Sequence, residues 1–162
     1  MADDQSFRPL PHPDTADGTP RKVGVEIEFA GLTEAESAAL AQQNLGGQTA
    51  PDGPRTLKVT ESELGTLEIV LDTALRRFDG NVLIDAGLDA ARGLVPVEIV
   101  TEPLNLSDLP TLDAFRASLR EAGAIGTADG VLLGFGVHFN VAVVAPDDTH
   151  TLNTVRAFAL CE

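Results

Sequence analysis

The sequence contains no tryptophan or tyrosine, seven phenylalanines and a single cysteine among its 162 residues. The hydrophobic core is therefore expected to consist mainly of aliphatic side chains. The single Cys161 excludes both an internal disulfide framework and a zinc site made of cysteines. No apolar run approaches the roughly 18 residues of a membrane-spanning helix, and residues 1–5 lack the basic and apolar segments of a signal peptide. We expect a soluble, cytoplasmic protein that does not bind membranes.

Basic residues are also scarce: 11 lysines and arginines stand against 25 aspartates and glutamates, for a formal net charge of −14. Such a chain has no basic patch for a nucleic-acid backbone, so nucleic acid is not an expected partner. Apolar residues make up 43% of the sequence, enough for one domain with a sizeable core. The proline-rich residues 1–21 predict a flexible, extended leader. The domain itself is expected to occupy residues 22–162.

Apolar and polar residues alternate in residues 22–29, the period-2 pattern of a strand with one buried face. Glu26 and Glu28 are therefore expected on the same side, with their α-carbons about 6.5–7 Å apart. Two carboxylates at this spacing repel each other unless a positive group lies near them, and a divalent cation can provide it. The alternative is an ordinary amphipathic strand whose outer face contacts water.

The rest of the chain divides into further helices and strands. Thr33-Glu34-Ala35-Glu36 has the form of a capping box and predicts the start of a helix that Gly46-Gly47 ends. The later elements are predicted by alternation for strands and by helical spacing of apolar residues for helices. They are a hairpin of strands 56–60 and 66–72, a helix within 73–93, strand 95–101, helix 109–122, strand 134–145 and a helix from about Thr151.

The strand predicted at 134–145 carries a histidine on its polar face. Its apolar residues are expected to face the core: Phe135, Val137, Phe139, Val141 and Val143. His138 and Asn140 are expected to face the other way, and the glycines at 134 and 136 allow a ligand or another strand to approach closely. The alternative for His138 is a core histidine with satisfied hydrogen bonds.

Four of the predicted strands carry ionisable or amide side chains opposite their apolar face. With helices packed on the apolar faces, we predict a two-layer α+β domain, a mainly antiparallel sheet with helices on one face. The other face would gather Glu26, Glu28, Glu68, Asp72, Glu98, His138 and Asn140. Oxygen-rich ligation with one imidazole suits Mg²⁺ or Mn²⁺ better than zinc. The alternative is a hydrated face that collects carboxylates because the whole chain is acidic.

Three segments resemble, in order, the signatures of the amidoligase family, which is related to glutamate–cysteine ligase and more remotely to glutamine synthetase. They are Gly24-Val25-Glu26-Ile27-Glu28-Phe29, Val97-Glu98-Ile99-Val100-Thr101-Glu102-Pro103-Leu104 and Gly136-Val137-His138-Phe139-Asn140. The segment Val70-Leu71-Asp72-Thr73 also resembles the family sequence between the first two signatures. The resemblance covers about residues 20–162. It implies a glutamine synthetase-like catalytic half-barrel, of which this chain is the N-terminal, incomplete part.

The resemblance also implies an activity: an ATP-dependent ligase that joins a carboxylate to an amine through an acyl phosphate. Glu26, Glu28, Glu98 and His138 match positions that bind Mg²⁺ or Mn²⁺, and His138 and Asp72 are the expected catalytic residues. Asn140 is expected to contact the nucleotide. The substrates would be a small-molecule or peptide carboxylate and an amine.

Two other functions remain open from the sequence. A metal-dependent hydrolase would use the same carboxylates to activate water, with no need of ATP. A metal- or nucleotide-binding module would use them without catalysis. The chain ends within a predicted helix, and family members continue with elements that complete the nucleotide and substrate sites, so we expect the front part of a longer protein.

Overall fold

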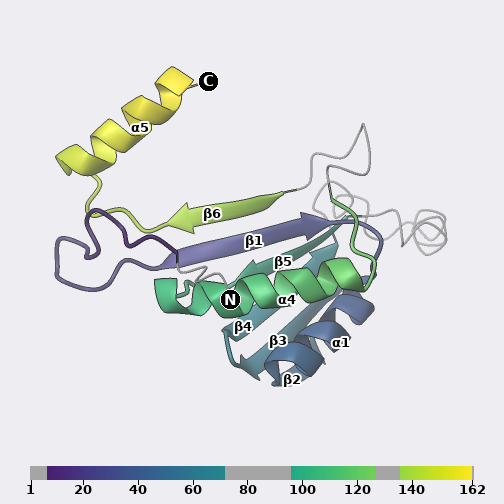
Figure 1. The fold of residues 1–162 in the computed structure, drawn as a ribbon. Helices are drawn as coiled ribbons and strands as arrows, with labels where there is room; N and C mark the ends of the chain where they lie inside the picture. Colours follow the sequence, from purple (N-terminus) through teal and green to yellow (C-terminus); the bar gives the residue numbers. More distant parts are fainter. Residues whose placement is uncertain (1–6, 72–95, 127–135, 162) are drawn as a thin grey trace, which may run out of the picture.

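The computed structural model of the chain describes residues 7–71, 96–126 and 136–161. Their strands form one six-stranded sheet in the order β2-β3-β4-β5-β1-β6, and every neighbouring pair is antiparallel (Figure 1). The strands are β1 Val23–Phe29, β2 Gln48–Pro51, β3 Thr56–Ser62, β4 Gly65–Leu71, β5 Val97–Thr101 and β6 Val137–Val141. The described helices are α1 Glu34–Leu45, the short 3₁₀ helix η2 Leu106–Asp108, α4 Leu109–Glu121 and α5 Thr149–Cys161.

Strand β1 lies between β5 and β6 and is hydrogen-bonded to both. Its apolar residues are buried, and the residues between them are half-buried on the opposite face. The alternation in residues 22–29 therefore predicted the strand and its buried face correctly. Because β1 is held on both edges, it provides a fixed frame for Glu26 and Glu28.

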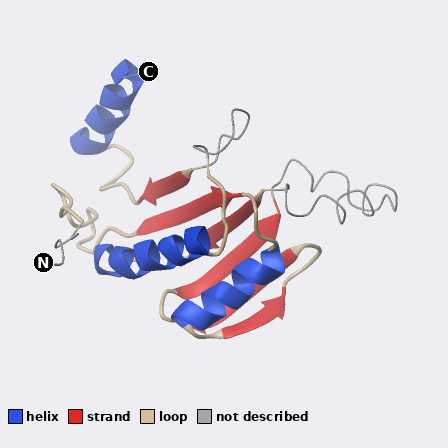
Figure 2. Cartoon of the chain, turned by 45° about the vertical axis from the view of Figure 1, so that its right-hand side comes forward, coloured by secondary structure: helices blue, strands red, loops and turns tan. Residues whose placement is uncertain are grey.

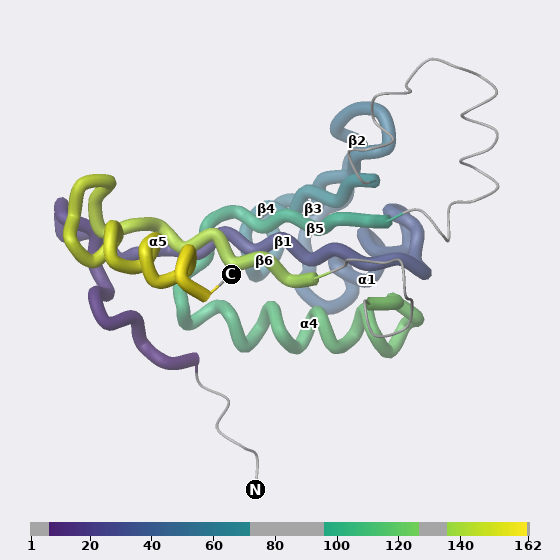
Figure 3. Tube along the Cα trace, turned by 90° about the horizontal axis from the view of Figure 1, so that it is seen from above, coloured from purple at the N-terminus to yellow at the C-terminus, as the bar shows by residue number. Residues whose placement is uncertain are grey.

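Helices α1 and α4 cover the same face of the sheet (Figure 2, Figure 3). The predicted capping box is present at the start of α1: the Thr33 amide donates to Glu36 Oε2 at 2.8 Å, and the Glu36 amide donates to the Thr33 hydroxyl at 3.2 Å. The helix ends at Gly46, whose amide donates to the Gln42 carbonyl. Helix α4 buries four apolar residues at helical spacing, Leu109, Leu112, Phe115 and Leu119, against the sheet.

The predicted α+β class, a mainly antiparallel sheet with helices on one face, is confirmed. Strand β2 was not predicted. Its four residues, Gln48–Pro51, are all exposed and include a proline, so they carry no alternation that indicates a strand. β2 is an edge strand, held by its backbone pairing with β3 rather than by burial.

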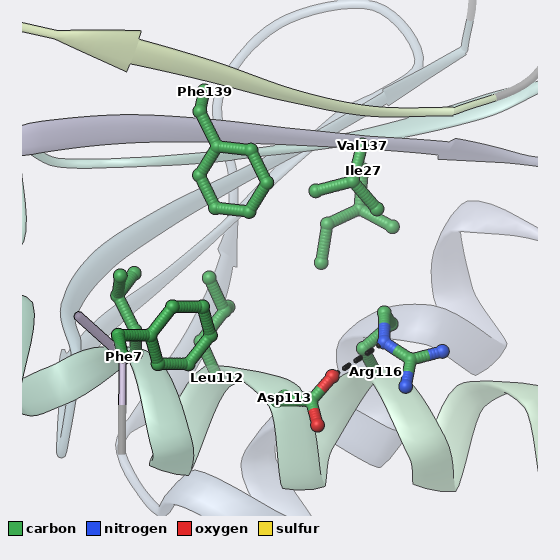
Figure 4. A pocket seen from close by; sticks show the side chains of 8 residues that line it. Phe7, Ile27, Leu112, Asp113, Arg116, Val137 and Phe139 are labelled. Atoms are coloured by element: carbon green, nitrogen blue, oxygen red, sulfur yellow. Dashed lines mark hydrogen bonds and ion pairs between the residues drawn. The ribbon is translucent and has the colours of Figure 1, made fainter. Parts of the chain in front are cut away.

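The prediction for strand 134–145 was wrong in length and in burial. β6 spans Val137–Val141, and its apolar side chains, with Val143 beyond it, are exposed rather than part of the core. Helix α4 does not extend over this edge of the sheet: an apolar groove of about 270 Å³ lies between α4 and β6, with Phe139 on one side and Leu112 on the other (Figure 4). Phe135 lies outside the described residues.

Helix α5 begins at Thr149, close to the predicted Thr151, and extends away from the sheet (Figure 1). Its apolar residues Leu152, Val155 and Phe158 are exposed. Alternation and helical spacing identified α5 and β6 as elements, but neither buries its apolar side in this structure. Among the described helices, none combines the length and the apolar character needed to span a membrane.

Part of the predicted leader contacts the segment that follows β6. Asp14 and Pro20 form an isolated β-bridge. The buried Arg21 donates from Nε to the Ala142 carbonyl at 2.6 Å and from Nη1 to the His12 carbonyl at 2.7 Å. These contacts connect the chain before β1 to the chain after β6.

Candidate active site

The polar side chains of neighbouring strands form rows across the sheet because the strands pair in register. In the central row, Glu26 of β1 lies opposite His138 of β6 on one side and Val100 of β5 on the other. Val100 is in turn opposite Glu68 of β4, and Glu68 is opposite Lys58 of β3. The buried residues of β1 and β5, on the side of α1 and α4, alternate with this row, so the row lies on the opposite face of the sheet.

The next row places two carboxylates side by side. Glu28 of β1 is directly opposite Glu98 of β5, and the β-carbons of residues paired in this way are about 4.5–5.5 Å apart. The Glu28 amide donates to the Gly136 carbonyl at 3.0 Å, which holds the start of β6 against β1 at the same level. A cation bound near this pair would reduce the repulsion between the two carboxylates.

Glu26 is oriented by two side chains of β6. Asn140 Nδ2 donates to Glu26 Oε1 at 2.8 Å, and His138 Nδ1 lies 3.4 Å from Glu26 Oε2. Each carboxylate oxygen has two acceptor sites, so both oxygens retain the capacity to bind a cation. Neighbours that fix the orientation of a carboxylate in this way improve it as a metal ligand.

The structure thus places Glu26, Glu28, Glu98, His138 and Asn140 on three adjacent strands. The His138 side chain is 60% exposed, which excludes the alternative of a core histidine. Asp72, the other expected catalytic residue, and the predicted helix within 73–93 lie outside the described residues.

A comparison with protein families matches residues 19–162 to the family described as "Putative amidoligase enzyme". The matched range takes in every described strand and helix. The chain belongs to the amidoligase family. The family named from the three sequence segments is thereby confirmed. Comparisons with curated proteins and with solved structures gave no match.

The donor atoms of this amidoligase have the chemistry that Mg²⁺ prefers, because three of the four expected ligands are carboxylates. Within residues 7–71, 96–126 and 136–161, however, no three His, Cys, Asp or Glu side chains converge closely enough to hold a metal ion. Mg²⁺ in nucleotide enzymes is commonly held by one or two carboxylates together with water and substrate phosphates. The residues therefore fit an ion that binds together with a phosphate-bearing substrate better than a preformed protein cage.

A second feature of the amidoligase sheet, a pocket of about 440 Å³ over β3, β4 and β5, was not predicted from the sequence. It is lined by Lys58, Thr60, Thr66, Glu68, Val100, Thr101 and Glu102. Lys58 Nζ lies 2.5 Å from Asp52 Oδ2. That contact, with a smaller contribution from Glu68, raises the pKa of Lys58 above its ordinary value.

Glu68 was placed on the polar face from the sequence, but nothing there joined it to Glu102 and Lys58. The pairing of β4 with β5 is the information that relates these residues, because it puts Glu68 opposite Val100. Glu102 comes two residues after Val100, so its side chain points to the same face of the sheet.

Proposed function

We propose that this amidoligase is an ATP- and Mg²⁺-dependent ligase that joins a carboxylate to an amine through an acyl phosphate. The observation that carries the proposal is the pair of polar rows on β5, β1 and β6, in which Glu26, Glu28, Glu98 and His138 share one face. The family match adds that such a chain is an amidoligase.

Phosphoryl transfer needs positive charge near the transferred group more than it needs covalent chemistry. Held by one or two carboxylates among Glu26, Glu28 and Glu98, with His138 beside them, and by the ATP phosphates, Mg²⁺ would neutralise the phosphate charge and align the reacting oxygens. The sequence contains no P-loop and has only 11 lysines and arginines. Binding ATP phosphates through carboxylate-held metal is therefore consistent with the composition of the chain.

The chain's own residues would orient the site. Asn140 holds Glu26 through one carboxylate oxygen, and His138 lies beside the other. Because both residues come from β6 and Glu26 from β1, the pairing of these two strands sets the position of the Glu26 carboxylate.

Isothermal titration calorimetry with ATP, in the presence and in the absence of Mg²⁺, tests the proposal. ATP is expected to bind only with Mg²⁺, and Glu26→Gln is expected to weaken that binding at least about tenfold because a charged ligand is lost. The matched control is Glu121→Gln, at the end of α4 on the other side of the sheet, and it should bind as the unmodified chain does.

The alternatives give different results in the same experiment. Binding of Mg²⁺ without any binding of ATP would favour the metal-dependent hydrolase. Equal ATP affinity in the unmodified chain and in Glu26→Gln, or no binding of either ligand, would contradict the ligase. The Asn140→Ala variant adds a graded result: a smaller loss than Glu26→Gln is expected, because Asn140 acts on Glu26 through one hydrogen bond.

A further inference from the structure

The pocket over β3, β4 and β5 carries charges of both signs on one face of the sheet. Glu68 and Glu102 supply two carboxylates, Thr60 and Thr66 supply hydroxyls, and Lys58 supplies an ammonium group. Lysine has three donors, and Asp52 lies close to Lys58 Nζ on one side. A ligand with a positive and a negative group close together would find a partner for each of them here.

The carboxylate of Glu102 lies over the turn between β3 and β4. A β-carbon added at Gly65 would lie only 2.8 Å from Glu102 Oε2. Gly65 also has a φ of +79°, a conformation that side chains disfavour. The glycine thus leaves room for the Glu102 carboxylate over the turn, and the Glu102 amide donates to the Thr66 carbonyl at 3.2 Å.

The pocket borders the carboxylate rows of the candidate active site. Its apolar residue Val100 lies on β5, directly opposite Glu26 of β1. Neighbouring strands are about 4.8 Å apart, so a group bound above Val100 is within one strand spacing of Glu26. This distance suits a second substrate that reacts with a carboxylate held beside Glu26.

We propose that this pocket is the subsite for the amine substrate, and that it recognises an α-amino acid. The ammonium group lies between Glu68 and Glu102, and the neighbouring carboxylate meets Lys58. The ammonium group must lose one proton before its nitrogen attacks the acyl phosphate, forms the C–N bond and displaces phosphate, and either Glu68 or Glu102 is placed to accept that proton. The assignment of the bound amino acid as the amine substrate rests on the proposed ligase function, but the binding itself does not.

Glycine is the probe, because it has no side chain that the pocket must accommodate. Methylamine keeps only its ammonium group, and acetate keeps only its carboxylate. Titration is followed through the Val100 methyl resonances by NMR at constant ionic strength, up to about 10 mM for glycine on the unmodified chain and up to about 500 mM for the two analogues and for the variants, because small charged ligands bind weakly. Glycine is expected to saturate the shift, and each truncated analogue should bind at least about tenfold more weakly.

Two variants assign each charge to its partner. Glu102→Gln is expected to weaken glycine and methylamine at least about tenfold and to leave acetate unchanged. Lys58→Met should weaken glycine and acetate and leave methylamine unchanged. A merely structural role of either residue would change all three probes together. Glu102 is exposed, so its substitution should not impair folding, and Glu121→Gln is the matched control, expected to leave all three unchanged.

The result separates this proposal from the ligase function. Loss of ATP binding in Glu26→Gln with no saturable glycine binding would overturn the subsite and leave the ligase standing. Glycine binding with the crossed pattern of variants, but no Mg²⁺-dependent ATP binding, would support the pocket and contradict the ligase. Equal binding of glycine, methylamine and acetate, or equal effects of both variants on all three, would also overturn the subsite.

Discussion

Similar patterns of apolar residues lead to burial on one side of the sheet and to exposure on the other. On the packed side, α1 and α4 lie over the sheet and bury the apolar residues of β3, β4 and β5. On the open side, β6 and α5 carry equally apolar stripes, yet these remain exposed. Val23 and Val141 illustrate the contrast: they are directly paired on neighbouring strands, but Val23 is 2% exposed and Val141 is 38% exposed.

The difference lies in coverage, not in the strands themselves. Alternation decides to which face a side chain points, whereas burial depends on a second layer above that face. Between α4 and β6 lies the apolar groove, which is lined by Ile27 of β1 together with Val137 and Phe139 of β6 (Figure 4). The candidate site joins the two regions, because Glu28 and Glu98 lie on strands of the packed sheet while His138 and Asn140 lie on β6.

The largest contrast is expected between two phenylalanines on helices. Phe115 of α4 is 1% exposed, and Phe158 of α5 is 66% exposed. Phe115→Ala should lower the free energy of unfolding by about 3–5 kcal/mol through lost burial and a cavity. Phe158→Ala should change it by less than about 0.5 kcal/mol. Urea denaturation of both variants checks this, and equal effects would mean that α5 packs against the domain in solution.

A smaller contrast is expected within the sheet. Val23→Ala removes buried methyl groups and should lower the free energy of unfolding by about 2 kcal/mol. Val141→Ala, at the paired position on β6, should cost about half of that or less, since this side chain is already partly in water. The same denaturation measurement applies. A cost at Val141 that matches Val23 would show that this end of β6 is covered in solution.

Most of the fold could be predicted because its signals are local. Alternation in residues 22–29 and 95–101 located β1 and β5, and the capping box located the start of α1. Strand β2 could not be predicted, because pairing to β3 holds four exposed residues that show no pattern of their own. The exposure of Phe139 could not be predicted either, because it depends on how far α4 extends over the sheet, and that is set by contacts between distant parts of the chain.

The candidate site was predictable to the level of a shared face. Period-2 geometry put Glu26 and Glu28 on one side of a strand, and the family motifs added Glu98, His138 and Asn140. The pairing of Glu28 with Glu98 and the hydrogen bond from Asn140 to Glu26 depend on strand order and register. Those are set by contacts between distant segments, so the sequence pattern alone did not contain them.

The smallest expected effect on stability concerns the capping box at the first turn of α1, one of the two helices that cover the sheet. Two donors of Thr33, first its amide and then its hydroxyl, lower the pKa of Glu36 below its ordinary value of 4.5. Because the pKa is lower in the folded state, this stabilisation is present above about pH 4.5 and is lost as the pH falls through the folded pKa.

Thr33→Ala should lower the free energy of unfolding by about 1 kcal/mol at neutral pH, since one helix-capping hydroxyl is removed. Glu36→Gln removes the titrating group, so its stability difference from the unmodified chain should shrink as the pH is lowered below 4.5. Urea denaturation across this pH range checks both variants, with Glu121→Gln as the control outside α1. A difference for Glu36→Gln that stays constant with pH would mean that the capping carboxylate does not contribute, and that packing against β3 and β4 alone holds α1.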